Sequence, residues 1–127
     1  MSLLSNIKKA HGEQGEQLAA QWLLDNGFEI LHANWRSGRY EIDLVARSLC
    51  DMELHIVEVK TRKAGSLTSP EEAYTKAKFR ALCAAANAYV ALYDMDVDVH
   101  FDLVAVELNE GALPEIRFIA DAMTPSW

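Results

Sequence analysis

The architecture of this chain follows from two segments, Arg39-Tyr40-Glu41-Ile42-Asp43-Leu44-Val45-Ala46 and, after a short polar break, His55-Ile56-Val57-Glu58-Val59-Lys60-Thr61-Arg62. Both are rich in Val, Ile and Leu, which is typical of strands covered on both faces, and they predict two neighbouring strands. Because side chains alternate across a strand, Glu41 and Asp43 share one face of the first segment. Glu58 and Lys60 share one face of the second in the same way. Ionised groups at such positions are costly unless they are paired or bind a metal, so these charges predict a functional site.

The residue types at this predicted site indicate a particular chemistry. Two carboxylates from adjacent strands can bind a hard divalent cation such as Mg²⁺ or Mn²⁺ through oxygen. An ammonium two residues further along the second strand would face a phosphate or an attacking water beside that ion. Such a set of groups is typical of an enzyme that cleaves phosphodiesters.

Several motifs carry a resemblance to known proteins. Asp43 followed by Glu58-x-Lys60 is similar to the D…ExK core of the restriction-endonuclease-like, or PD-(D/E)xK, superfamily. Further motifs resemble, in order and spacing, the small bacterial YraN-type family: Gly12-x-x-Gly15-Glu16-x-x-Ala19, Asn34-x-Arg36, Glu41-Ile42-Asp43-Leu44 and Val57-Glu58-Val59-Lys60-Thr61-Arg62. The likeness continues through Lys76, Ala86 to Tyr89 and Phe101-Asp102 and so covers nearly the whole chain. That family usually has Gly where this chain has Tyr40, a difference that bears on substrate access.

The resemblance implies a fold and a set of roles. The fold is a three-layer α/β/α type, restriction-endonuclease-like, with a mixed sheet of about five strands flanked by helices. Asp43 and Glu58 would bind Mg²⁺ or Mn²⁺, with the Val59 carbonyl as a third oxygen. Lys60 would orient or help deprotonate the attacking water and stabilise the charge of the transition state.

Two further acidic residues have supporting roles in this scheme. By spacing alone Glu16 is a solvated charge on the first helix, whereas the resemblance implies that it joins the metal site directly or through water. Glu41 would support the site from outside the ligand shell. The similarity to small Holliday junction resolvases implies a nucleic-acid substrate, DNA rather than RNA, with branched DNA included.

The charge distribution limits how the chain would bind nucleic acid. The formal net charge of −7 argues against tight nonspecific binding to duplex DNA. Cations are nevertheless concentrated between residues 60 and 80, while eight acids against one Arg lie between residues 94 and 121. The candidate phosphate contacts are Arg36, Arg62, Lys76 and Arg80. A surface cation is an equally open interpretation of Arg36, and a solvated helix face is the alternative for Lys76 and Arg80.

The remaining pattern predicts the order of elements. A capping box of Ser69, Pro70 and Glu72 predicts the start of the second helix, and Gly27 follows the end of the first. The short connections between the first three strands predict an antiparallel meander. The predicted elements are a helix over residues 6–25, strands over 28–35, 39–46 and 55–62, a helix over 69–92, and strands over 97–108 and 115–120.

Length and composition place the chain in a broad class. Its 127 residues predict one domain with a core of its own. It has neither an apolar run of about 18 residues nor a signal-peptide pattern, so we expect a cytoplasmic protein that makes no membrane contact. Cys50 and Cys83 lack metal-site spacing and are expected to be incidental thiols.

Other functions stay open at this point. A noncatalytic nucleic-acid-binding or protein-interaction module would keep the fold and use the Asp-Glu-Lys network as structure, and the acidic balance suits a protein partner. A small-molecule enzyme using His100 and Asp102 is a third reading. These two residues share one face of a late strand, where a solvent-exposed structural pair is the expected role. A homodimer is also open.

Overall fold

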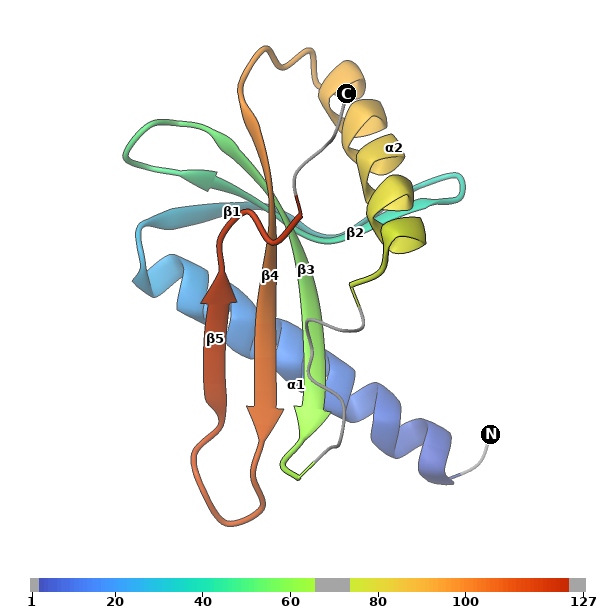
Figure 1. Ribbon diagram of the computed structural model, residues 1–127, viewed down its shortest axis with the longest axis vertical. Coiled ribbons are helices and arrows are strands. Elements are labelled where there is room, and N and C mark those ends of the chain that lie inside the picture. The colour runs from blue at the N-terminus through green and yellow to red at the C-terminus, as the bar shows by residue number, and fades with distance from the viewer. Residues whose placement is uncertain (1–2, 66–73, 124–127) are drawn as a thin grey trace.

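Five strands form one mixed sheet, and two helices pack against its opposite faces (Figure 1). The computed structural model describes residues 3–65 and 74–123, with side chains described from residue 12 onward. The elements are α1 (Leu3–Asp25), β1 (Phe28–Ser37), β2 (Tyr40–Ser48), β3 (Leu54–Lys63), α2 (Lys76–Leu92), β4 (Val99–Leu108) and β5 (Glu115–Ile119). The predicted α/β class is confirmed, as is the antiparallel meander of β1, β2 and β3.

The sheet order is β1-β2-β3-β4-β5, and only β3 and β4 run parallel. A parallel pair needs a crossover connection, and α2 belongs to that crossover. β3 pairs with β4 along its whole length, from Leu54 opposite Val99 to Lys63 opposite Leu108. β3 and β4 therefore form the centre of the sheet.

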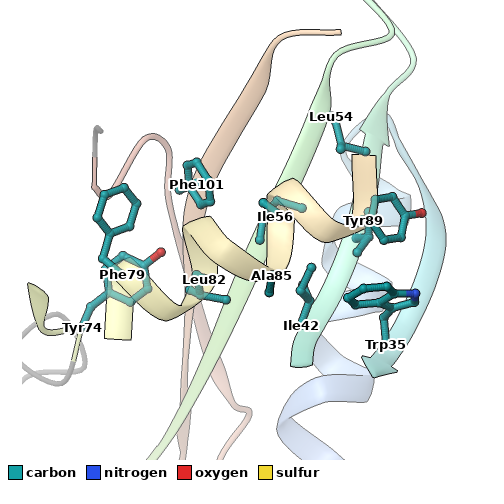
Figure 2. Packing of buried hydrophobic residues seen from close by; sticks show 12 residues of the cluster. Trp35, Ile42, Leu54, Ile56, Tyr74, Phe79, Leu82, Ala85, Tyr89 and Phe101 are labelled. Atoms are coloured by element: carbon teal, nitrogen blue, oxygen red, sulfur yellow. The ribbon is translucent and has the colours of Figure 1, made fainter. Parts of the chain in front are cut away.

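Each helix closes its own hydrophobic cluster. Alternation along β3 sends Ile56 to the α2 side and Val57 to the α1 side. The α2 side is rich in aromatic rings, and Figure 2 shows Trp35, Tyr89 and Phe101 packed there. Its buried members are Trp35, Ile42, Val45, Leu54, Ile56, Tyr74, Phe79, Leu82, Ala85, Ala86, Tyr89 and Phe101. The α1 side holds Ala19, Leu23, Leu44, Ala46, Val57, Val59, Val104 and Val106.

A glycine allows α1 to lie close against the sheet. Gly15 is buried, and a side chain in its place would collide with the Thr61 side chain on β3. Such close approach is a reason to keep Gly inside a helix despite its cost in conformational entropy. α1 ends at Asp25, and Gly27 adopts a positive φ of 86° immediately beyond it, as its position in the sequence predicted.

The start of the second helix differs from the prediction. α2 begins at Lys76, and the Thr75 hydroxyl accepts a hydrogen bond from the Lys78 backbone N–H at 3.2 Å. Tyr74 and Thr75 are not helical, so the expectation of a continuous helix from residue 69 is wrong. Ser69, Pro70 and Glu72 lie outside the described residues. A Thr whose side-chain oxygen accepts such a bond satisfies one of the unpaired N–H groups of the first turn, which fixes the start of the helix here.

The expected exposed pair of His100 and Asp102 is also wrong. Asp102 is 0% exposed, because β4 lies between two strands and both of its faces are covered. Its carboxylate accepts a hydrogen bond from the Asp121 backbone N–H at 2.8 Å and lies 2.5 Å from His55 Nδ1. His100 instead contacts Asp121 and Glu53, at 2.9 and 3.3 Å.

Asp102 is therefore expected to be structural. Asp102→Ala should lower the free energy of unfolding by about 3 kcal/mol, because it leaves the half-buried His55 ring and the Asp121 N–H without their charged partner. Urea denaturation measures this loss. Asp98→Ala, which removes an exposed carboxylate near the start of β4, is the matched control and should cost less than about 0.5 kcal/mol. A loss below about 1 kcal/mol for Asp102→Ala would contradict the assignment.

Two further findings concern the class of protein. Cys50 and Cys83 are free thiols, as expected. Among residues 3–65 and 74–123, neither helix has the length and apolar character needed to cross a lipid bilayer.

Candidate active site

The candidate site lies where β2 and β3 separate. The last residue pair between the two strands at this end is Leu44 opposite Val57. Asp43, which precedes Leu44, and Glu58, which follows Val57, lie directly beyond this pair. At this fork the Asp43 side chain takes the place of a backbone partner, because its Oδ2 accepts a hydrogen bond from the Val59 N–H at 2.9 Å. The bond holds the Asp43 carboxylate against β3, beside Glu58. The prediction that these two carboxylates meet across neighbouring strands is confirmed.

Glu58 is the most buried charged group of the site. It is 4% exposed and its Oε1 contacts two ammonium groups: Lys78 Nζ at 2.5 Å and Lys60 Nζ at 3.5 Å. Lys60 reaches Glu58 along the same face of β3, as the alternation predicted, whereas Lys78 comes from the first turn of α2. A buried carboxylate requires such compensation, and here two cations supply it.

A cleft of about 410 Å³ gives access to the two carboxylates. Exposed residues at its mouth, Arg39 and Glu41, connect it to solvent. Tyr40 lies on its wall, with the Arg39 guanidinium 5.7 Å from the ring centroid, and its effect on substrate access stays a prediction. The lining consists of Arg39, Tyr40, Glu41, Asp43, Glu58, Lys78, Ala81, Leu82 and Ala84.

The electrostatics of the cleft favour a bound cation. The pKa of Asp43 is raised to about 7, first by burial and then by the negative charges of Glu58 and Glu16, against the opposing effect of the Val59 N–H. Burial and the neighbouring Lys78 charge lower the pKa of Lys60. Burial also disfavours the charged form of Lys78, but the contact with Glu58 outweighs it and raises the Lys78 pKa. Asp43 is thus a carboxylate whose charged form is disfavoured by its surroundings.

The described residues suit a sparsely coordinated ion rather than a closed cage. Within residues 12–65 and 74–123, no three His, Cys, Asp or Glu side chains converge as a metal-binding group. Glu16 is half-buried on α1 and close enough to affect Asp43 electrostatically, without completing such a group. Mg²⁺ is commonly held by one or two carboxylates and keeps several waters, which matches this arrangement.

Of the predicted supporting and nucleic-acid-binding residues, Glu41 lines the cleft, and the four cations are not among its lining residues. The Glu41 carboxylate pairs with Arg36 at 3.8 Å, and both side chains are more than half exposed. Arg62 is half-buried and donates to the Thr61 carbonyl at 3.2 Å. Lys76 and Arg80 are exposed on α2, four residues apart on one surface. Their contact with nucleic acid stays a prediction.

Lys78 is the residue of the cleft that the sequence reasoning missed. The sequence reasoning counted it only among the cations between residues 60 and 80. Helical spacing contains the missing signal, because Lys78 precedes the buried Leu82 by four residues and therefore lies on the buried stripe of α2. A lysine at the end of a buried stripe is a candidate partner for a buried carboxylate.

The fold and the family can now be stated together. A mixed five-stranded sheet with a helix on each face and carboxylates at a strand fork is an α/β architecture consistent with the restriction-endonuclease-like fold. The chain belongs to the uncharacterised protein family UPF0102, whose model matches residues 15–106. The family resemblance found in the sequence is thereby confirmed.

Three relatives illustrate the similarity. A UPF0102 protein of Porphyromonas gingivalis (strain ATCC 33277) is 44% identical over 107 residues, which cover 84% of this chain and 78% of the relative. A UPF0102 protein of Bacteroides thetaiotaomicron is 40% identical over 114 residues, covering 90% of this chain and 92% of the relative. One from Phocaeicola vulgatus is 38% identical with the same coverage.

Proposed function

We propose that this protein is a metal-dependent endonuclease that cleaves nucleic-acid phosphodiesters, with DNA as the preferred substrate. The observation that carries the proposal is the pair of carboxylates, half-buried Asp43 and buried Glu58, held together at the β2–β3 fork with Lys60 beside them. Two lining residues that are exposed, Arg39 and Glu41, connect this pair to solvent. A purely structural charge network has no need of such access.

The donor set fits Mg²⁺ or Mn²⁺. Asp43, Glu58 and the Val59 carbonyl would hold the ion, and Glu16 would act through a water. Fit is supported by the raised pKa of Asp43, since burial and two neighbouring carboxylates disfavour its charged form and a divalent cation would relieve that repulsion. When bound, the ion supplies a Lewis acid and lowers the pKa of a bound water.

Lys60 supplies the group that acts on the reacting atoms. Its side chain is 20% exposed and lies 3.5 Å from Glu58, so it is oriented toward the carboxylates without being buried. Because burial and the neighbouring Lys78 lower its pKa, the Lys60 ammonium releases a proton more readily than that of an ordinary lysine. It would orient the attacking water, accept its proton, and stabilise negative charge that develops on the phosphate.

The charge of the chain restricts the substrate. A net charge of −7 leaves only local cations such as Lys76 and Arg80 to contact phosphates. Binding that depends on a few cations is weak and decreases with salt. We therefore expect junctions, flaps or gaps, which can bend into the cleft, to be cleaved in preference to plain duplex.

A noncatalytic nucleic-acid-binding or protein-interaction module is the second candidate. One observation favours it: Glu58 is already compensated within the chain by Lys78 and Lys60. If that compensation is complete, the site has no need of a metal. Metal binding therefore discriminates between the two functions.

The proposal predicts that isothermal titration calorimetry detects Mn²⁺ binding and that Asp43→Ala and Glu58→Ala each abolish it. Each substitution removes an oxygen ligand from a site that has few. Glu41→Ala is the matched control, since its carboxylate pairs with Arg36 and should not be a ligand. Wild-type affinity in both Asp43→Ala and Glu58→Ala would make the metal assignment wrong and favour the noncatalytic module.

A further inference from the structure

Glu58 has one more cation than the ExK motif accounts for. The motif supplies Lys60, which lies 3.5 Å from Glu58 Oε1, yet the shorter contact to the same oxygen is that of Lys78 Nζ at 2.5 Å. Lys78 comes from α2, on the opposite side of the cleft from β3. The helix thus brings the Lys78 ammonium into contact with Glu58, the carboxylate that the proposed function makes a metal ligand.

The Lys78 head group has freedom to move. Its side chain is 36% exposed, whereas that of Glu58 is 6% exposed, so the lysine end of the pair faces the open cleft. Its backbone N–H is fixed by the Thr75 hydroxyl at 3.2 Å, which anchors the residue but leaves the four-carbon side chain free. From this anchor the ammonium can contact Glu58 or extend toward a ligand in the cleft.

A lysine and a divalent cation cannot both contact the same carboxylate oxygen without strong repulsion between their charges. We propose that Lys78 occupies the metal position on Glu58 in the metal-free protein, and that metal binding displaces it toward a phosphate of the substrate. This inference rests on the proposed metal-dependent function and assigns a role to a residue outside the ExK motif. Lys78 then couples metal binding to substrate binding.

The coupling has two consequences with opposite signs. Removing Lys78 should tighten metal binding, because the metal no longer displaces an ammonium. The same change should weaken substrate binding in the presence of metal, because the displaced cation is lost as a phosphate contact. Since coupling between two ligands is reciprocal, the increase in DNA affinity caused by metal should also decline. Removing a lysine that serves only to neutralise Glu58 would also tighten metal binding, but it would leave the metal-dependent gain in DNA affinity unchanged, so the second effect is the one that discriminates.

The test compares Lys78→Met with Lys76→Met, which removes the same charge from an exposed position on the same helix. Mn²⁺ affinity is measured by calorimetry, and DNA affinity by fluorescence anisotropy with a labelled four-way junction. The anisotropy variants also carry Lys60→Ala to slow cleavage. Lys78→Met should bind Mn²⁺ about 5- to 10-fold more tightly than wild type and lose most of the metal-dependent gain in DNA affinity. Lys76→Met should keep the wild-type Mn²⁺ affinity and weaken DNA binding equally with and without metal, so that the metal-dependent gain is unchanged.

A second measurement uses the wild-type protein and does not depend on how well Lys78→Met folds. The ¹⁵N signal of the Lys78 ammonium, assigned by its loss in Lys78→Arg, should shift when Mg²⁺ is added. An unchanged signal at saturating Mg²⁺, or Mn²⁺ affinity in Lys78→Met equal to or below that of wild type, would overturn the role of Lys78 and leave the metal site standing. Absence of metal binding in every variant would instead overturn the proposed function, and this inference with it.

Discussion

Lys60→Ala is expected to slow DNA cleavage by about 10²- to 10³-fold, the usual cost of removing one electrostatic group that acts on the transition state. Lys60 contacts Glu58 at 3.5 Å but supplies no oxygen to a metal, so the variant should bind Mn²⁺ with near wild-type affinity. Single-turnover cleavage with enzyme in excess measures the rate of the cleavage step, and calorimetry measures the Mn²⁺ affinity.

The control for this prediction is Lys76→Ala, which removes a cation from the exposed face of α2. It should weaken DNA binding at most and leave the single-turnover rate at saturating enzyme unchanged. If Lys60→Ala cleaves as fast as wild type, Lys60 does not act on the reacting atoms. If it loses the metal as well, it is required for the structure of the site rather than for the chemical step.

Asp43→Asn should be more stable than the wild-type protein at pH 8 in the absence of metal. The pKa of Asp43 is raised from its usual 3.8 to about 7, first by burial and then by Glu58. Between these two values the folded protein holds a proton that the unfolded chain releases, so the free energy of unfolding of the wild type decreases as the pH rises. The full shift corresponds to about 4 kcal/mol, reached above pH 7, and it vanishes below pH 4.

Thermal unfolding in EDTA from pH 4 to pH 8 measures this difference. Asn retains an oxygen that can accept the Val59 N–H, so the substitution removes the ionisation and keeps the hydrogen bond. Adding Mn²⁺ at pH 8 should restore stability to the wild type and not to Asp43→Asn, because a ligand that binds the folded state stabilises it. If the stabilities of the two proteins change with pH in parallel, ionisation of Asp43 does not destabilise the wild type, and the prediction is wrong.

Much of the site could be predicted because it follows from local rules. Alternation along two apolar segments placed Asp43 and Glu58 together and put Lys60 on the face of Glu58. The short connections between β1, β2 and β3 fixed their antiparallel order. The fork itself could not be predicted. It arises because β3 pairs with β4 along its whole length, whereas β2 pairs with β3 only from Leu44 to Arg47. This depends on contacts between distant segments and cannot be seen in the local sequence pattern.

The failures have a common physical cause, which is tertiary contact overriding a local pattern. Asp102 alternates like an exposed residue, yet β4 is central and both of its faces are covered, so the carboxylate is buried and paired with His55. Lys78 looks like a solvated helix charge until Glu58 is placed opposite α2. The described helix starts after Thr75, whose side-chain oxygen caps it, rather than running continuously from residue 69.

The most direct test of metal-dependent cleavage is a panel of labelled linear, flapped and four-way DNA, together with structured RNA, incubated at low salt with Mg²⁺ or Mn²⁺. Asp43→Asn serves as the inactive control, because it removes a charged ligand and retains the fold. We predict metal-dependent products from the wild type, strongest on flapped or four-way DNA, and none from Asp43→Asn. No metal-dependent product on any member of the panel, with enzyme in excess over substrate, would contradict the nuclease function and favour the noncatalytic module.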